Sequence, residues 1–413
     1  MFKGLPKQLS AYMNLLRLAY SFYKENKLEV WITIIVFSNI FQQFVPAQLY
    51  FVGLFLFAIQ YRKYKPASHP KRSLFVAFVL LLWFSSIVGS SLDLRLVAIT
   101  IVLLVTAPSV SFDWYQYKLN LLKCFYWGFA GVTLLNFYAK LIGYNYIGQF
   151  QDAYTLGRQF EFSGFGRFAM WTSCAAAIST MVFTSYAFRN RTSSKLFNII
   201  CYAMILVSLY VVMISASRAA FVLAIACSLL VVKMQTNSGG KLLRNLIILG
   251  VTASLFAPIL EDNAEAMLRK RNGFQITTKN TSRDELWGNR MEEFRSSPIW
   301  GIGFAAHGVG ANKRIGRFES GGSYISVLAQ AGLIGILLVF FIWLAASSLP
   351  GNIPKDPNII LTYGAFVFMT IHCAIEGYMF QAGWYLCFIV WLVVGVMIET
   401  KYFKNEIEEE NLE

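Results

Sequence analysis

Six arginines within or between apolar segments are the residues best suited to chemistry. Arg218 lies inside the apolar stretch "VVMISASRAAFVLAIA" (211–226), where a guanidinium in hydrocarbon costs several kcal/mol. The other five lie in polar connections and are Arg158, Arg167, Arg283, Arg290 and Arg295. A planar guanidinium binds two phosphoryl oxygens at once, so this set favours a phosphate or diphosphate ligand. Taken alone, Arg218 also fits an arginine at a helix end whose charge reaches the lipid headgroups.

The composition places these arginines in a membrane protein. The chain has 413 residues, of which 56% are hydrophobic and 14% charged, and its mean hydropathy is +0.52. Soluble domains carry about 25% charged residues and do not hide this much apolar surface. We therefore expect an all-α polytopic membrane protein.

Twelve apolar runs divide the chain, and a spanning helix needs about 20 such residues. The runs are 30–44, 46–61, 73–91, 95–112, 121–143, 165–187, 197–216, 219–233, 246–260, 324–346, 359–379 and 382–399. They predict about twelve transmembrane helices.

The placement of Lys and Arg orients these helices. Connections expected inside the cell hold 21 of the 36 basic residues, as the positive-inside rule requires. The expected organisation is a cytoplasmic amphipathic segment (1–29), helices 1–9 (30–260), an extracytoplasmic loop (261–323), helices 10–12 (324–399) and a cytoplasmic tail (400–413). The loop holds ten basic and eight acidic residues, and long loops escape the rule.

The loop carries its own local signals. "SRDELWGNRMEEF" has helical spacing and predicts a helix that presents Arg283, Trp287 and Arg290 on neighbouring turns. Pro298 is expected to end that helix, and "GIGFAAHGVG" is expected to be a flexible glycine-rich turn.

Four segments in this order, "SRAAFV", "SRDELW", "FRSSPIWGIG" and "SYISVLAQAGLIGILL", resemble the O-antigen ligase and O-antigen polymerase (Wzy) superfamily. The similarity covers about residues 155–345, and twelve helices with one large outer loop between helices 9 and 10 fit it. The resemblance implies a GT-C-like glycosyltransferase of the bacterial cytoplasmic (inner) membrane. Such an enzyme transfers a glycan from an undecaprenyl-diphosphate donor to a sugar hydroxyl at the outer face, without metal and with inversion.

The resemblance also implies roles for the arginines. Arg218 matches the arginine of the "SR" turn and Arg283 that of the large loop, and both are expected to hold the donor diphosphate. Arg290 is expected as a third contact, with Arg158 and Arg167 beside it. The sequence has no metal-ligand spacing, so we expect no metal and no cofactor.

One departure concerns the base that activates the acceptor. Ligases carry a His followed by Asn shortly before the segment that matches "SYISVLAQAGLIG", and this sequence reads "ESGGSY" there. Glu319 and His307 are the remaining candidates for a base. The alternatives are a helix-capping or Arg317-paired role for Glu319, and an exposed loop histidine for His307.

The missing histidine makes a polymerase of a surface polysaccharide (O-antigen, capsule or exopolysaccharide) the first hypothesis, with lipid-linked repeat units as donor and acceptor. A ligase that transfers glycan to lipid A core or another final acceptor is the alternative within the same class. A lipid-linked oligosaccharide flippase or other transporter is the alternative from another class. Expected partners are the undecaprenyl-diphosphate-linked glycans, membrane lipids, a flippase and a chain-length regulator, with no nucleic acid.

Overall fold

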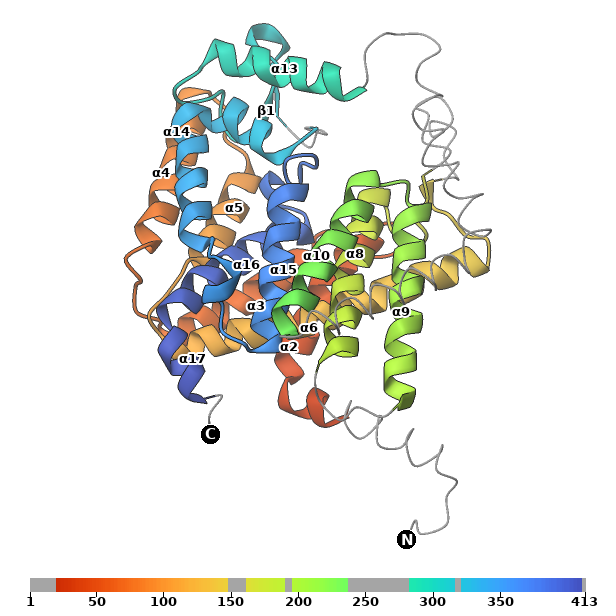
Figure 1. Cartoon of the computed structure of the whole chain (residues 1–413). Coiled ribbons are helices and arrows are strands. Elements are labelled where there is room, and N and C mark those ends of the chain that lie inside the picture. The colour runs from red at the N-terminus through yellow and green to blue at the C-terminus, as the bar shows by residue number, and fades with distance from the viewer. Residues whose placement is uncertain (1–19, 148–160, 190–194, 237–281, 316–320, 411–413) are drawn as a thin grey trace, which may run out of the picture.

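The computed structural model describes residues 20–147, 161–189, 195–236, 282–315 and 321–410, and these form a bundle of helices (Figure 1). The helices of these ranges are α2 (Lys27–Phe37), α3 (Leu49–Tyr64), α4 (Arg72–Val88), α5 (Leu94–Thr106), α6 (Phe112–Leu141), α8 (Ala169–Phe188), α9 (Lys195–Ile214), α10 (Arg218–Gln235), α13 (Ser282–Ser296), α14 (Ser323–Ala346), α15 (Pro357–His372), α16 (Tyr385–Tyr402) and α17 (Lys404–Glu410). Within the described ranges, the sheet is limited to the antiparallel pair β1 (Ala306–His307) and β2 (Arg314–Ile315).

Eleven of the twelve predicted apolar runs coincide with helices, and the twelfth, 246–260, lies outside the described residues. In the described part, α9, α10, α14 and α16 are long and apolar enough to cross a membrane, and α4, α5 and α15 are shorter apolar helices. The protein is therefore a helical, multi-pass membrane protein. The run 30–44 becomes the 11-residue α2 followed by a 3-10 turn at Ser38–Phe41. At 1.5 Å per residue α2 is about 16 Å long, roughly half the thickness of the hydrocarbon core.

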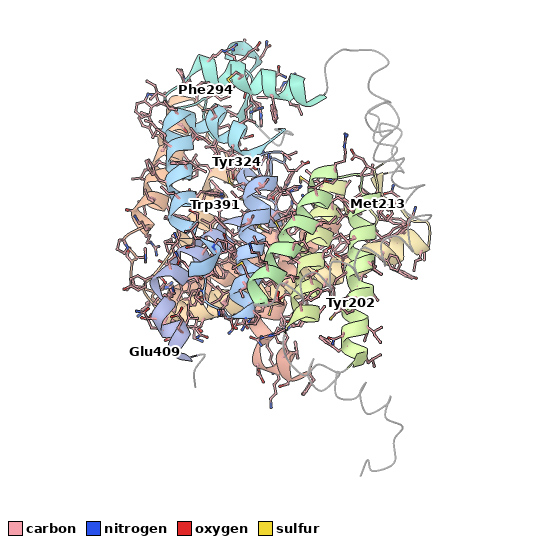
Figure 2. The ribbon with its side chains drawn as sticks, in the orientation of Figure 1. Tyr202, Met213, Phe294, Tyr324, Trp391 and Glu409 are labelled. Carbon is pink, nitrogen blue, oxygen red and sulfur yellow. The ribbon has the colours of Figure 1, made fainter. Side chains whose placement is uncertain are left out.

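Helix α16 forms the centre of the bundle. Every residue from Tyr385 to Thr400 is buried, so the apolar character of α16 serves packing against other helices. The ring of Trp391 packs in the middle of the molecule against Phe75 and Phe78 of α4 and Trp343 of α14 (Figure 2). Helices α4, α14 and α16 therefore meet around one tryptophan.

A buried ion pair joins α16 to α6. Lys118 Nζ lies 2.6 Å from Glu399 Oε2, and neither side chain is exposed. Glu399 Oε1 also accepts hydrogen bonds from the backbone N–H (2.7 Å) and the hydroxyl (2.9 Å) of Ser109. The charge of Glu399 is thus compensated by one cation and two donors, which a buried carboxylate requires.

The bundle has two ends, which we name by the helices that mark them. The α13 end carries α13 and β1, and the α17 end carries α17 (Figure 1). Helix α9 runs from Tyr202 to Met213 toward the α13 end, and α14 begins at that end near Tyr324 (Figure 2). The turn between α9 and α10 therefore faces the same way as α13. The expected cytoplasmic tail (400–413) is helical where described, because α16 continues to Tyr402 and α17 follows.

Candidate active site at the α13 end of the bundle

A tight turn presents Arg218. Helix α9 ends at Ile214, Ala216 adopts a left-handed backbone conformation (φ 55°), and Arg218 is the first residue of α10. The hydroxyl of Ser215 donates to Val211 O at 2.8 Å and so satisfies one of the last carbonyls of α9. The Arg218 side chain is exposed. The predicted turn is confirmed, and its arginine can reach a ligand at this end of the bundle.

A second ordered segment, residues 161–168, presents Arg167 at the same end, just before α8. Asn136 of α6 holds the segment, because its side-chain oxygen accepts from Phe165 N at 2.9 Å. A Cβ at Gly164 (φ 57°) would lie 2.3 Å from that same oxygen. The exposed guanidinium of Arg167 donates to Gln42 at 3.0 Å and lies over the ring of Phe168. Arg158, predicted to act beside Arg167, lies outside the described residues.

Helix α13 carries the loop arginines. The predicted helix over "SRDELWGNRMEEF" is confirmed, since α13 spans Ser282–Ser296 and ends before Pro298. Arg283 is its second residue, although its side chain lies outside the described part. The indole N–H of Trp287 donates to Gly321 O at 2.8 Å, which ties α13 to the start of α14. Glu319, two residues before Gly321, lies outside the described residues.

The structure places Arg290 in a buried polar centre, whereas Arg167 and Arg218 are exposed. Its side chain is 5% exposed, and its Nη1 lies 2.7 Å from Glu293 Oε2. The same guanidinium bonds to Ala306 O at 3.4 Å and to Nδ1 of His307. The sequence predicts a diphosphate contact for Arg290, and the structure pairs its charge with Glu293, a carboxylate that the sequence analysis missed. The three-residue spacing of Arg290 and Glu293 on one helix was the available signal.

Burial shifts both partners of this pair toward neutrality. It raises the pKa of Glu293 above its ordinary value, against the opposing effects of the Gly308 N–H and of Arg290. Burial likewise lowers the pKa of Arg290, but a guanidinium remains charged at any pH a protein meets. Arg290 therefore stays a cation whose field is directed at Glu293 and His307.

His307 differs from the sequence-based alternative of an exposed loop histidine, which is wrong. The residue is 6% exposed and sits in β1, paired with Arg314 of β2. A guanidinium only donates, so His307 Nδ1 is the acceptor and a neutral ring carries its proton on Nε2. With the Nδ1 lone pair engaged by Arg290, this histidine is better placed to position the loop than to remove a proton.

The expectation that "GIGFAAHGVG" is flexible is also wrong. Residues 301–307 are all buried, and the segment docks into a break in α14. Gly332 leaves the helical conformation (φ 66°, ψ −165°), which frees two backbone N–H groups of α14. Leu333 N then donates to Pro298 O at 2.8 Å and Ile334 N to Ile299 O at 3.4 Å.

Side chains of two helices complete the docking of this segment. Gln330 of α14 accepts from Ala305 N at 2.9 Å, and Ser86 of α4 accepts from Phe304 N at 3.0 Å. Gly303 N donates to Gln330 O at 3.1 Å. The segment is therefore fixed to α4 and α14 through its backbone. The two quoted motifs "FRSSPIWGIG" and "SYISVLAQAGLIGILL" therefore contact each other and form one structural unit.

A comparison with known protein families finds a match that includes this unit. Residues 203–340 match the family model described as O-antigen ligase. The match begins within α9, includes the Arg218 turn, α13 and the docked segment, and ends within α14. The resemblance to the O-antigen ligase and polymerase superfamily is thus confirmed over these residues. A search of curated proteins returns no match to the chain. Among the described residues, no group of three or more His, Cys, Asp or Glu side chains could hold a metal.

Proposed function

We propose that this protein polymerises a bacterial surface polysaccharide. It would act in the cytoplasmic (inner) membrane, with its site on the extracytoplasmic face. The donor is a glycan on undecaprenyl diphosphate, and the acceptor is a lipid-linked repeat unit. The family match over residues 203–340 and the exposed Arg218 at the α13 end support glycan transfer, and the segment "ESGGSY", which lacks a histidine, supports a polymerase.

In the proposed reaction, an acceptor hydroxyl attacks the anomeric carbon of the donor from the side opposite the diphosphate. The bond to the diphosphate oxygen breaks, the anomeric centre inverts, and the acceptor proton passes to a base. Negative charge grows on the leaving diphosphate, and preorganised cations lower the barrier to this step. Arg218 and Arg283 are the cations we assign to it, with Arg158 and Arg167 at the edge of the site.

The remaining candidates divide by their surroundings. Glu319 is our choice for the base, because it lies two residues from Gly321, which Trp287 holds in place. His307 and Arg290 would position the loop, since each engages the other within a buried centre. A carboxylate in a partly dry site acts as a base near neutral pH when its pKa is raised.

Two other functions are the competitors. The family description favours a ligase, whereas the absence of a histidine from "ESGGSY", the segment directly before α14, favours the polymerase. A transporter uses broken helices to bind its cargo near the middle of the membrane. Helix α14 is broken at Gly332, but the carbonyls of Pro298 and Ile299 occupy the freed donors. This backbone pairing supports an anchored loop more than a cargo site.

The glycan profile of a deletion strain separates these functions. A polymerase deletion should leave surface glycan with one repeat unit, or lipid-linked single repeats, and the wild-type gene should restore long chains. Long lipid-linked chains that never reach their final acceptor would identify a ligase and overturn the polymerase proposal. Accumulation of lipid-linked repeats only on the cytoplasmic side would identify a transporter.

A further inference from the structure

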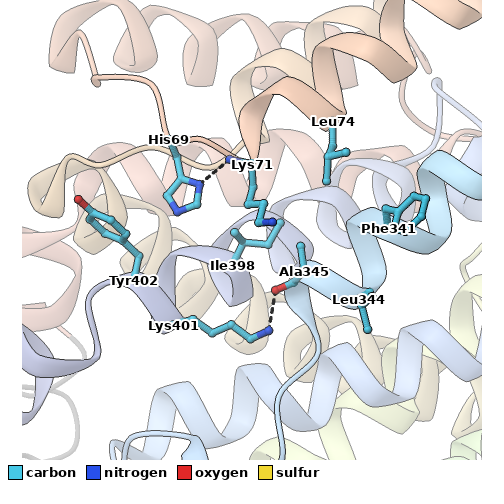
Figure 3. Close-up of a pocket in the computed structure, with 9 residues that line it drawn as sticks. All are labelled: His69, Lys71, Leu74, Phe341, Leu344, Ala345, Ile398, Lys401 and Tyr402. Carbon is cyan, nitrogen blue, oxygen red and sulfur yellow. Dashed lines mark hydrogen bonds between the residues drawn. The ribbon is translucent and has the colours of Figure 1, made fainter.

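A pocket at the α17 end, opposite the candidate active site, has the composition of an anion site. Its volume is 520 Å³, and it is formed where the start of α4 meets the last turns of α14 and α16 (Figure 3). The lining residues are His69, Lys71, Leu74, Phe341, Leu344, Ala345, Ile398, Lys401 and Tyr402. They include two lysines and no acid, so the pocket itself leaves their charge uncompensated.

The polar side of the pocket is built from fixed groups. Lys401 Nζ donates to Ala345 O at 2.7 Å, which uses one of its three N–H bonds and holds the ammonium beside the end of α14. His69 is buried, and its Nδ1 accepts from Lys71 N at 3.0 Å, which leaves the imidazole proton on Nε2. Burial, and the charges of Lys71 and Lys118, lower the pKa of His69, so its ring is neutral at pH 7. The charge of the pocket therefore comes from Lys71 and Lys401, and both side chains are exposed.

The apolar side continues along the surface of α14. Leu333, Leu337, Phe340, Phe341 and Leu344 are all exposed, by 46–58%, and follow one face of the helix at spacings of three and four residues. Helix α14 is long and apolar enough to cross a membrane. The apolar stripe on this spanning helix ends at the two ammonium groups of the pocket. An acyl chain joined to a charged headgroup has the same arrangement of apolar and charged parts.

We propose that this pocket binds the phosphate of an anionic membrane phospholipid, with Lys71 and Lys401 on the phosphate oxygens and an acyl chain along the exposed face of α14. Lysines near the membrane surface attract anionic lipid, and basic pockets between helices accept phosphate headgroups. The apolar stripe favours a lipid over free phosphate, because a soluble anion gains nothing from Leu337 or Phe341. Binding here is independent of the glycan chemistry proposed for the other end.

Native mass spectrometry of the purified full-length protein in detergent tests the proposal. The probes are dioleoylphosphatidylglycerol, dioleoylphosphatidylcholine and inorganic phosphate, each titrated separately. We expect a phosphatidylglycerol adduct that binds more tightly than phosphatidylcholine. Lys71→Gln, which keeps the Lys401 bond to Ala345 O, should weaken that adduct about fivefold, and Lys71→Gln/Lys401→Gln about 25-fold.

A matched variant separates the pocket from general charge. Lys63→Gln/Lys404→Gln removes two cations near this end that do not line the pocket, and it should bind phosphatidylglycerol as the wild type does. Equal losses in the pocket and control variants, or no loss in Lys71→Gln, would overturn the proposal. Binding of inorganic phosphate with no preference for phosphatidylglycerol over phosphatidylcholine would also overturn it, in favour of a free-anion site. Unfolding temperatures in phosphatidylcholine check that each variant folds.

Discussion

At the scale of single residues, the arginines of the α13 end lie in two different environments. Arg167 and Arg218 are exposed at the ends of segments that hold their backbones, whereas Arg290 is enclosed by Glu293 and His307. An exposed guanidinium can form the two parallel bonds that a diphosphate offers. A buried, paired guanidinium would first have to leave its carboxylate uncompensated, which is costly. We therefore expect substitution of an exposed arginine to affect ligand binding, and substitution of Arg290 to leave the charge of Glu293 without its partner.

Arg218→Ala and Arg283→Ala should each lower polymer formation at least about 100-fold, the typical effect of removing one preorganised donor. Arg283→Lys should also be poor, because an ammonium lacks the bidentate fork. Arg314→Ala is the matched control, since Arg314 is an exposed arginine of β2 at the same end and is not one of the expected ligand contacts. Polymer length on gels and protein level in membranes are the two measurements. Full-length polymer in both alanine variants would rule out the diphosphate role.

Glu293 should make stability depend on pH. Its pKa is raised in the folded protein above the ordinary 4.5, mainly by burial, so the folded state binds this proton more tightly. The stabilisation from this group is then fully present below pH 4.5 and is lost as the pH rises through the raised pKa. The unfolding temperature of the wild type should fall over that range relative to Glu293→Gln. Glu292→Gln, at the exposed neighbour, should keep the wild-type slope; equal slopes in all three proteins would contradict the shift.

At the scale of elements, α14 and the segment after α13 depend on each other. The break at Gly332 exposes two donors of α14, and the carbonyls of Pro298 and Ile299 accept from them. The break and the docked segment are therefore one feature, because either alone would leave these backbone N–H and C=O groups without these partners. Helix α13 is tied to α14 at two points. Pro298, just after α13, accepts from Leu333, and Trp287 of α13 donates to Gly321, just before α14.

Gly332→Ala should undock the segment. Gly332 has a φ of 66°, and a Cβ there would lie 2.2 Å from Ile299 O, so both the backbone conformation and the space oppose it. Trypsin should then cleave faster at Arg314, and polymer formation should fall. Gly131→Ala is the matched control, because Gly131 lies in α6 with open space around its Cα. Unchanged cleavage in Gly332→Ala would mean that the docking does not depend on this glycine.

At the scale of the whole molecule, the two ends have different chemistry. The α13 end presents arginines on ordered turns and a loop fixed by its backbone. The α17 end presents Lys71 and Lys401 in its pocket, beside the buried pair of Lys118 and Glu399. Helices α4, α14 and α16 meet around Trp391 and join the two ends. The two ends therefore present different kinds of cation, arginine at the α13 end and lysine at the α17 end.

Reporter fusions test the orientation. Alkaline phosphatase fused after Asn312 should be active, because that position lies at the α13 end in the loop expected outside the cell. The same reporter fused after Ser68 should be silent, because Ser68 precedes α4 at the opposite end. A cytoplasmic reporter such as β-galactosidase should show the inverse pattern. Activity of the phosphatase at Ser68 and not at Asn312 would reverse the orientation and move the proposed site to the cytoplasm.

The sequence by itself determined the class of the protein and where its helices lie. Hydropathy is a local property, so the apolar runs predicted the helices of the described part, and "SRDELWGNRMEEF" predicted α13. The four quoted segments predicted the family that residues 203–340 match. The turn before Arg218 was also predictable, because three small residues, two of them serines, lie between two apolar runs.

Only the tertiary structure decided which polar groups meet. The spacing of Arg290 and Glu293 was a local signal, but the enclosure of this pair beside His307 of β1 follows from packing that no local pattern encodes. The glycines of "GIGFAAHGVG" suggest a flexible turn, but residues 301–307 are buried. Without side chains, these glycines let the backbone approach the break in α14. The burial of His307 and the pairing of Lys118 with Glu399 also result from the packing of elements that are distant in sequence. Contacts between residues far apart in the chain depend on how the helices pack, and packing is a property of the whole bundle.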